Sequence, residues 1–570
     1  MLRFLFNNHK ENQGIMASSN RDQNLWDEGN IVAMFGTRAS LRTQLPANSV
    51  LIVPSNDLWN DFGNRSRVDV RINLTGNKGE HVTSAFIGFI TSSPDEPNGI
   101  KQLEKLLEGV DSLTLPAIDS NRFFTMLPSM EAYRDIVRKF GVKQSVSILK
   151  AMKDLVALNE FKASTNWLDL ATNTDIFLKS FIRNSESYFA YKNAGPILRG
   201  LRFEEFHRLS KSLYIHFHLP GRKNAHELLF RFDHEADLPK RIAVIIGKNG
   251  VGKSQTLGRI VQAALKGNNS LIDGETGERI LVNRILAFAP TNETGSVFPS
   301  DRRKLSQIWY RRFSLNRSGT RQKRAGVADQ VLQVARSEEY IGETTRWDIF
   351  LKALEAIDNW EQLCLPVSGR GRKPLSLRNL KIDTEERNLI NYSAIDTNKE
   401  PLRVINDIGY PLSSGEISFL RFAAQASLYV ENGSLLLLDE PETHLHPNFI
   451  SQFVSLLDSL LSQTGSAAII ATHSAYFVRE VFQEQVAVLR NDNDGYIRIE
   501  TPTLRTFGAD VGAISYFVFG EDEPSQLAST VEKRLLAKYN SWEELYARYK
   551  NELSPEMLGA LRESLEAGRS

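Results

Sequence analysis

The sequence contains a single cysteine, Cys364, in 570 residues, so no disulfide can form within the chain. Sparse cysteine in a chain of this length is typical of a reducing compartment. No segment approaches the about 18 consecutive apolar residues of a transmembrane helix. The apolar residues at the start of the chain also give way to polar ones too early for the core of a signal peptide. These absences predict a cytoplasmic protein that does not cross a membrane.

The sequence also lacks an excess of either charge. Its 69 basic residues nearly balance its 68 acidic ones, so any attraction to nucleic acid must come from local basic patches. The apolar and charged fractions, 41% and 24%, are those of globular proteins and exclude a disordered chain or a small disulfide scaffold. At about 100 to 200 residues per domain, the length predicts roughly three or four domains.

The first 200 residues hold no catalytic motif. Alternating apolar and polar residues at 68–74, followed by an apolar run at 82–90, predict an antiparallel hairpin. From about 100 to 209 the pattern is helical, with Ser129 as a predicted N-cap and Gly141 as a break between two helices. We interpret this region as a structural or partner-binding module.

A glycine-rich turn follows the next set of predicted strands. Residues 212–218 and 227–232 predict a second antiparallel hairpin, and 241–246 is a continuous apolar run, as in buried parallel strands of α/β folds. The turn at 247–254 matches G-x-x-x-x-G-K-[ST], with a strand predicted before it and a helix after it. Backbone N–H groups and the helix N-terminus of such a turn face phosphate groups. The pattern therefore predicts a nucleotide-binding loop.

Two side chains of this turn have predicted roles with ATP and Mg²⁺. Lys253 would reach the β- and γ-phosphates, and the Ser254 hydroxyl would ligate Mg²⁺. The predicted nucleotide-binding residues of the turn are Gly247, Asn249, Gly250, Gly252, Lys253, Ser254 and Gln255.

A second apolar strand is predicted to end in two carboxylates, Asp439 and Glu440. Asp439 would hold Mg²⁺ directly or through water, and Glu440 is placed to polarise the water that attacks the γ-phosphate. A strand ending in Asp-Glu is, by itself, equally typical of a solvated strand end, and the lysine turn makes it specific. A third apolar run, 467–471, precedes His473. A lone histidine there is more often an ordinary polar terminus, but here it follows the other motifs in order.

The segment Leu412-Ser-Ser-Gly-Glu416 is similar to the LSGGQ signature of ABC-type ATPases. Ser413 and Gly415 match the signature, whereas Ser414 and Glu416 replace a glycine and the glutamine. Together the four motifs cover roughly residues 210 to 520 and resemble an ABC-type ATPase head. The resemblance implies that Glu440 and His473 are catalytic, with His473 as the switch histidine near the γ-phosphate. It also implies a head-to-tail homodimer in which Ser413 and Gly415 of one protomer cap the ATP of the other.

An insertion separates the lysine turn from the signature. The roughly 160 residues from Lys253 to Ser413 exceed the spacing of transporter ATPases. The insertion carries a basic cluster, Arg302, Arg303, Lys304, Arg311, Arg312, Arg317, Arg321, Lys323 and Arg324. With Trp309, Tyr310 and Phe313 interleaved, this cluster suits phosphate neutralisation and base stacking. It equally suits a solvated basic surface that packs against an acidic partner, and both interpretations stay open.

The phrase at 439–447, Asp-Glu-Pro-Glu-Thr-His-Leu-His-Pro, is similar to soluble ATPases of the RecF-like, OLD-like, AAA_21-like and PtuA-like groups. OLD-like proteins add a nuclease domain with clustered acidic metal ligands, but only about 97 residues follow His473 and they show no convincing set. We therefore expect no intrinsic nuclease. The chain most resembles the PtuA-like ATPases of Septu antiphage systems, including those attached to retrons.

That resemblance implies specific partners and leaves alternatives. It implies a separate HNH nuclease of the PtuB-like kind and, in retrons, a reverse transcriptase with its single-stranded DNA. One alternative is a DNA-maintenance ATPase, like RecF or SMC proteins, that clamps duplex DNA. Another is a scaffold that binds ATP without hydrolysing it, although the intact Glu440 argues against this.

The predicted fold class is α/β. It comprises an ABC-type head, with a P-loop sheet, an antiparallel β subdomain and a helical insertion, and an N-terminal α+β module. The predicted segments are an extension at 1–20, the N-terminal module at 21–205, the head at 206–525 with its insertion at about 300–400, and C-terminal helices at 526–570. Two details of the ATP site stay open. No glutamine occupies the expected lid, where Asn292 is a weak substitute, and the residue that stacks on adenine could be Phe217, Phe230 or Phe232.

Overall fold

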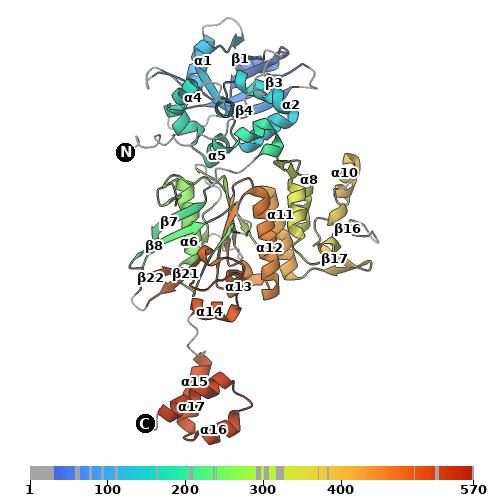
Figure 1. Cartoon of the computed structure of the whole chain (residues 1–570). Helices are drawn as coiled ribbons and strands as arrows, with labels where there is room; N and C mark the ends of the chain where they lie inside the picture. The colour runs from blue at the N-terminus through green and yellow to red at the C-terminus, as the bar shows by residue number, and fades with distance from the viewer. Residues whose placement is uncertain are drawn as a thin grey trace, which may run out of the picture.

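The structure of the protein is a computed structural model. It describes residues 31–57, 64–75, 80–91, 96–108, 113–161, 165–204, 210–234, 238, 240–289, 297–300, 307–315, 326–369, 372–381, 384–492, 495–519 and 526–567. Figure 1 shows the N-terminal module above the head, and the last three helices at the opposite end of the molecule. The predicted α/β class is confirmed by the parallel sheet of the head and the helices around it.

The N-terminal module is built on a six-stranded sheet with the order β5-β1-β2-β3-β4-β6. Its strands are β1 (Val32–Gly36), β2 (Ser49–Pro54), β3 (Arg67–Asn73), β4 (His81–Phe89), β5 (Thr114–Pro116) and β6 (Phe123–Met126). Its helices are α1 (Ile100–Glu108), α2 (Met130–Ala151), α3 (Leu155–Glu160), α4 (Thr165–Thr172) and α5 (Ser185–Asn193). Most buried apolar residues of the strands and helices form one core, and Leu45, Leu51 and Val53 form a small second cluster.

Several predictions for this module are confirmed. β3 and β4 pair in antiparallel fashion, and Val70 lies opposite Thr83. The Ser129 side chain accepts a hydrogen bond from the backbone N–H of Ala132 and so caps α2. Gly141 breaks this helix with φ 71° and ψ 166°, a conformation that favours glycine. The prediction of helix throughout 100–209 is wrong at β5 and β6, where short strands complete the sheet.

The head contains a seven-stranded sheet with the order β12-β11-β19-β20-β9-β21-β22. Its strands are β9 (Ile242–Gly247), β11 (Arg284–Ala289), β12 (Trp309–Ser314), β19 (Leu435–Asp439), β20 (Ala467–Thr472), β21 (Val486–Asn491) and β22 (Ile497–Glu500). All pairs except β21–β22 are parallel. Every residue of β9, β19 and β20 is buried, which explains their uninterrupted apolar sequences.

Helices and a smaller sheet surround this parallel sheet. The helices are α6 (Lys253–Lys266), α11 (Ser414–Tyr429), α12 (Pro447–Thr464), α13 (Ala475–Arg479) and α14 (Val511–Phe519). The predicted antiparallel hairpin is confirmed as β7 (Ser212–His218) and β8 (Ala225–Arg231), with β10 (Leu271–Asp273) as a third strand. These three strands form the antiparallel β subdomain of the predicted fold.

The region at about 300–400 contains helices and strands. The expected helical character is present in α8 (Val327–Arg336), α9 (Arg346–Leu354) and α10 (Glu385–Ala394). The sequence did not predict that β12 is an edge strand of the main sheet. Two small sheets were also not predicted; their strands are β13 (Tyr340–Ile341) and β14 (Thr344–Thr345), and β15 (Leu363–Leu365), β16 (Leu375–Ser376), β17 (Leu402–Ile405) and β18 (Ile408–Pro411).

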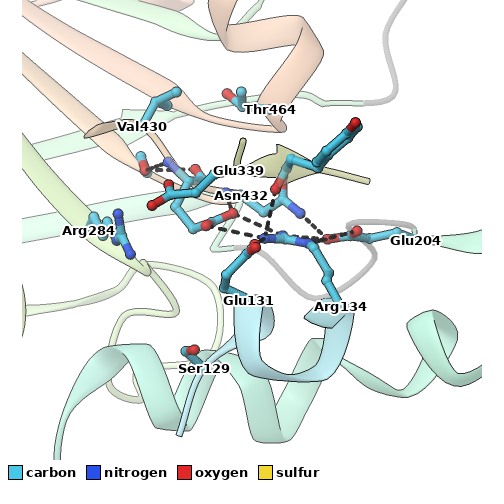
Figure 2. A network of polar contacts seen from close by, with 12 residues as sticks. Ser129, Glu131, Arg134, Glu204, Arg284, Glu339, Val430, Asn432 and Thr464 are labelled. Atoms are coloured by element: carbon cyan, nitrogen blue, oxygen red, sulfur yellow. Dashed lines mark hydrogen bonds and ion pairs between the residues drawn. The ribbon is translucent and has the colours of Figure 1, made fainter. Parts of the chain in front are cut away.

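A buried network of charges joins the N-terminal module to the head. Arg134 of α2 is fully buried and donates to the carboxylates of Glu204 and Glu431, at 2.6 and 2.9 Å. Figure 2 shows this arginine with Glu131 and Glu204 around it. Glu431 lies in the short loop between α11 and β19. The module is therefore attached next to one end of a central strand of the head.

The last helices have a small core of their own. They are α15 (Gln526–Lys538), α16 (Trp542–Tyr549) and α17 (Pro555–Ala567), and their buried residues include Leu545 and Leu561. Within the part of the chain that the structure describes, no helix combines the length and apolar character that crossing a membrane requires. The predicted domain boundaries stay predictions.

Candidate nucleotide-binding site

The predicted phosphate-binding turn lies between β9 and α6. β9 ends at Gly247, and α6 begins at Lys253 with Gly252 as its N-cap. Gly252 has φ 101°, a left-handed conformation that side chains rarely tolerate. A Cβ atom at Gly247 would lie 2.3 Å from the carbonyl oxygen of Leu489, so the close approach of β21 also requires a glycine there. The glycines of the motif thus satisfy two separate steric demands.

The Lys253 side chain is buried beneath this turn. Its Nζ donates hydrogen bonds to the carbonyl oxygens of Gly247 and Lys248, at 2.9 and 3.2 Å. Burial lowers the pKa of Lys253, and the negative charges of nearby carboxylates, Glu440 foremost, oppose this shift. The turn therefore folds around a lysine whose cation is placed beside the carboxylates at the ends of the neighbouring strands.

Asp439 ends β19 and is buried. Burial raises the pKa of Asp439 to about 6, and the nearby Ser254 side chain opposes this shift. Among the described residues, its Oδ1 atom is buried without a hydrogen-bond partner. A buried carboxylate oxygen without a partner beside a hydroxyl is the kind of oxygen donor set that Mg²⁺ prefers. Ser254 and Asp439 therefore fit the predicted role of holding Mg²⁺.

The order of the sheet brings three motifs to one edge. β19, β20 and β9 are neighbouring parallel strands, with Asp439 opposite Ala471 and Thr472 opposite Ile246. The carboxyl ends of parallel strands meet at the same edge of a sheet, which is where ligands bind in open α/β sheets. The phosphate-binding turn, the two carboxylates and the predicted switch histidine are thus brought together by the topology.

Glu440 and His473 lie next to each other at this edge. The His473 Nδ1 atom is 3.6 Å from Glu440 Oε1, and the two side chains are 46% and 33% exposed. Glu440 adopts φ 44° and ψ 53°, an uncommon left-handed conformation for a residue with a side chain. Its backbone N–H donates to the carbonyl oxygen of Ala471, at 2.8 Å, and this bond holds the strained turn against β20.

Glu442 was not predicted from the sequence as a site residue. Its Oε1 atom accepts hydrogen bonds from the Thr472 hydroxyl, at 2.6 Å, and from the His473 backbone N–H, at 3.0 Å. The same atom lies 3.6 Å from His473 Nδ1, and the side chain is only 9% exposed. A signal was available, because Glu442 is a further carboxylate two residues beyond Glu440. Its partners lie 30 residues away, and no local pattern identifies them.

The signature segment begins α11. Ser413 is the N-cap of this helix, and its hydroxyl donates to Glu416 Oε2 at 2.7 Å while the Glu416 N–H donates back to the hydroxyl. Gly415 is buried in the first turn. Glu416, which replaces the glutamine of the signature, also pairs with Arg403 at 2.6 Å. A surface cleft of about 500 Å³, lined by Arg403, Glu416 and His446 among others, lies beside it.

The structure describes two of the nine basic candidates, Arg311 and Arg312, both on β12. The Arg311 guanidinium lies 3.9 Å from the ring centroid of Tyr429, and Arg312 Nη1 donates to the carbonyl oxygen of Phe298 at 3.0 Å. The candidates outside the described residues are Arg302, Arg303, Lys304, Arg317, Arg321, Lys323 and Arg324. Two rings expected to stack on bases, Tyr310 and Phe313, are instead buried in the head.

The burial of the candidate rings reduces the choice of residues that could stack on adenine. Phe230 and Phe232 are core residues, at 2% and 4% exposure, so neither ring is free to stack on adenine. Phe217 is partly buried and stacks on His226 with ring centroids 5.0 Å apart. The lid candidate Asn292 lies outside the described residues.

Comparisons with known proteins point to the same part of the chain. Residues 242–479 match the family described as "AAA domain, putative AbiEii toxin, Type IV TA system". Over 108 residues the chain is 36% identical to protein ea59 of Escherichia phage lambda, which covers 19% of this chain and 20% of that protein. Over 70 residues it is 39% identical to UvrABC system protein A of Chlamydia muridarum (strain MoPn / Nigg), which covers 12% of this chain and 4% of that protein. The matches thus span one fifth or less of both relatives.

A solved structure of a metal-chelate type ABC transporter in an inward-facing conformation is also similar. It is 19% identical, with a TM-score of 0.25, over 51% of this chain and 83% of that chain. The family match covers less than half of this chain, but it contains the phosphate-binding turn, both strand-end carboxylates, the signature segment and His473. Residues 242–479 thus match the model of an AAA-type ATPase family, and the match supports an ABC-type ATPase.

Proposed function

We propose that the protein binds and hydrolyses ATP at the edge of the sheet formed by β9, β20 and β19. The observation that carries this proposal is the convergence of Lys253, Asp439, Glu440 and His473 at that edge. Lys253 supplies a positive charge for the phosphates, and the partly exposed Glu440 carboxylate is placed to accept a proton from an attacking water. Mg²⁺, held by Ser254 and Asp439, would neutralise phosphate charge.

The proposed active form is a head-to-tail homodimer with two shared ATP sites. Its support is the signature segment at the start of α11, where Ser413 and Gly415 stand at a helix N-terminus. A helix N-terminus favours phosphate groups. In this arrangement ATP holds two heads together and hydrolysis releases them.

Nucleotide binding and turnover test the site directly. Purified protein should hydrolyse ATP in a Mg²⁺-dependent way and should form a dimer with ATP. A protein that binds ATP, dimerises and shows no turnover would support the scaffold alternative. A protein that binds no ATP would contradict the assignment of the site.

The cellular role that we propose is regulation of a separate effector nuclease in a cytoplasmic antiphage defence system. Its support is the resemblance of residues 439–447 to the PtuA-like ATPases, together with a matched family whose description refers to a toxin and a toxin–antitoxin system. The partners expected on this basis are an HNH nuclease of the PtuB-like kind and, in a retron, a reverse transcriptase with its single-stranded DNA. The basic residues at 302–324 are then candidates for contact with that nucleic acid or with a partner protein.

A pull-down from the native operon tests this role. The tagged protein is recovered under mild conditions, and mass spectrometry and nucleic-acid analysis identify what accompanies it. An HNH nuclease, with or without a reverse transcriptase and short branched DNA, would support the defence role. Recovery of the ATPase alone, or with replication proteins, would favour the DNA-maintenance alternative in which the dimer clamps duplex DNA.

A further inference from the structure

Glu442 links the turn after β19 to the tip of β20. One of its oxygens, Oε1, accepts from both the Thr472 hydroxyl and the His473 backbone N–H. The Thr472 hydroxyl oxygen in turn accepts from the backbone N–H of Ser474, at 2.9 Å, directly before α13. The carboxylate thus holds Thr472 and His473 directly and Ser474 through the Thr472 hydroxyl, and His473 is the predicted switch histidine.

The two glutamates of this turn have different surroundings. Glu440 is 33% exposed and lies beside His473, so its carboxylate can reach solvent and substrate. Glu442 is 9% exposed, and its Oε1 atom already accepts two hydrogen bonds. Its second oxygen, Oε2, is buried without a hydrogen-bond partner among the described residues. Glu440 is therefore suited to act on a water molecule, and Glu442 is suited to hold protein groups in place.

We propose that Glu442 is a positioning residue for ATP hydrolysis, which orients His473 and the tip of β20 against the carboxylate of Glu440. This inference rests on the proposed ATPase function. The His473 Nδ1 atom lies 3.6 Å from an oxygen of each glutamate, so the imidazole stands between the two carboxylates. The hydrogen bond from the His473 backbone N–H to Glu442 holds the backbone from which the imidazole extends. The hydrogen bond from the Thr472 hydroxyl to the same carboxylate holds the preceding residue.

The charge of Glu442 matters because one of its partners, Thr472, is buried. Thr472 is fully buried, so removal of the carboxylate leaves its hydroxyl and the His473 N–H without their acceptor. Hydrogen bonds to an ionised acceptor are shorter and stronger than those to a neutral one. A glutamine in this position can still accept both bonds through its amide oxygen, but more weakly. An alanine cannot accept either bond.

The test compares steady-state ATP hydrolysis by the full-length protein with that of Glu442→Ala and Glu442→Gln. Glu442→Ala should lower kcat by about 10²-fold, the size of effect that a displacement of about 1 Å at a catalytic group produces. The KM for ATP should change little, because Lys253 and the phosphate-binding turn keep their own hydrogen bonds. Glu442→Gln should recover part of the lost kcat. Thr472→Val should lower kcat in the same direction, and its effect should not add to that of Glu442→Ala.

Glu484→Gln is the matched control. Glu484 is a carboxylate of the same head that pairs with Lys240 at 2.7 Å near the surface, and its loss should leave kcat unchanged. The positioning role would be overturned if Glu442→Ala kept the wild-type kcat. It would also be overturned if Glu442→Ala and Glu442→Gln lost kcat equally and both lost ATP binding.

Hydrogen exchange separates this inference from the ATPase proposal. Peptides that contain residues 472–474 should exchange faster in Glu442→Ala than in the wild type or in Glu484→Gln, because the His473 N–H has lost its acceptor. If the wild type does not hydrolyse ATP, the ATPase proposal fails, and the exchange result alone decides whether Glu442 holds the tip of β20. Unchanged exchange in Glu442→Ala would overturn the inference even if the wild type is an active ATPase.

Discussion

Arg134 provides the most demanding test of how the N-terminal module is attached to the head. This fully buried arginine of α2 pairs with Glu204 and Glu431, which are themselves 1% and 3% exposed. Arg134→Met keeps much of the side-chain volume and removes the charge. Two carboxylates then remain buried with fewer partners, and breaking a buried pair in this way costs about 3 to 5 kcal/mol. We expect the free energy of unfolding to fall by that amount at pH 7.

The pKa of Glu431 supplies an independent estimate of this magnitude. Burial raises that pKa, but the positive charges of Arg134, Arg284 and Arg346 outweigh burial and lower it to about 2. A change of the Glu431 pKa from an ordinary value near 4.3 to about 2 corresponds to about 3 kcal/mol in the free energy of unfolding. Because the pKa is lower in the folded state, this contribution is present above about pH 4.5 and is lost as the pH falls toward 2. Burial raises the pKa of Glu204, which offsets part of the gain.

Urea unfolding followed by circular dichroism measures the effect, and Arg138→Met is the control. Arg138 lies one turn further along α2, is 25% exposed and pairs with Glu131 at 2.8 Å, so its loss should cost no more than about 1 kcal/mol. The difference in the free energy of unfolding between the wild type and Arg134→Met should also shrink as the pH is lowered from 7 to 4. At lower pH the carboxylates that have lost Arg134 take up protons. Equal stability of the two variants at pH 7 would refute the reasoning.

Three further predictions concern the ATP site and the module. Lys253→Ala should abolish binding of a fluorescent ATP analogue, because the buried cation of the turn is removed; retained turnover would contradict the site. Glu440→Gln should trap an ATP-bound dimer, visible by light scattering after gel filtration, and an unchanged dimer fraction would contradict signature capping. Burial raises the pKa of Asp154 to about 7, so the contribution of this carboxyl to the stability of the wild type should fall by about 4 kcal/mol as the pH rises from 4 to 7. Asp154→Asn should remove that contribution and make the loss of stability with rising pH shallower in thermal unfolding, and an unaltered slope would contradict its assignment to Asp154.

The parts of the fold that the sequence predicted are those governed by local patterns. β9, β19 and β20 are buried on both faces, so each is an uninterrupted apolar run. Ser129 and Gly141 have local signatures because a cap and a left-handed glycine act within one turn of a helix. The phosphate-binding turn was predicted residue by residue for the same reason, since its function depends on a contiguous backbone.

The strand β12 was not predicted because two adjacent arginines interrupt its aromatic residues. Arg311 and Arg312 suggested an exposed basic segment, but β12 is the edge strand of the main sheet. An edge strand tolerates charged side chains, and here Arg311 covers the ring of Tyr429 while Arg312 bonds to a backbone carbonyl. The neighbouring rings of Tyr310 and Phe313 pack into the two separate cores on opposite faces of the sheet. The sequence alone does not distinguish rings buried in this way from rings exposed to a ligand.

The contacts of Glu442 and Glu431 were beyond prediction because their partners are distant in sequence. Arg134 and Glu431 are separated by 297 residues, and neither has a local pattern that identifies the other. A buried charge is unfavourable until its partner is in place, so such residues look like ordinary surface residues in the sequence. Their importance becomes visible only when the fold shows that they are buried.

The location of Glu431 ties the N-terminal module to the ATP site through a single strand. β19 begins four residues after Glu431 and ends at Asp439, and all five of its residues are buried between β11 and β20. A strand paired on both sides cannot slide without breaking its ladder of hydrogen bonds. Any movement of α2 that pulls on Glu431 must therefore either break the buried ion pairs or displace the loop that joins the signature helix α11 to β19. The junction is thus a physical connection between the module and the carboxylates of the proposed ATP site.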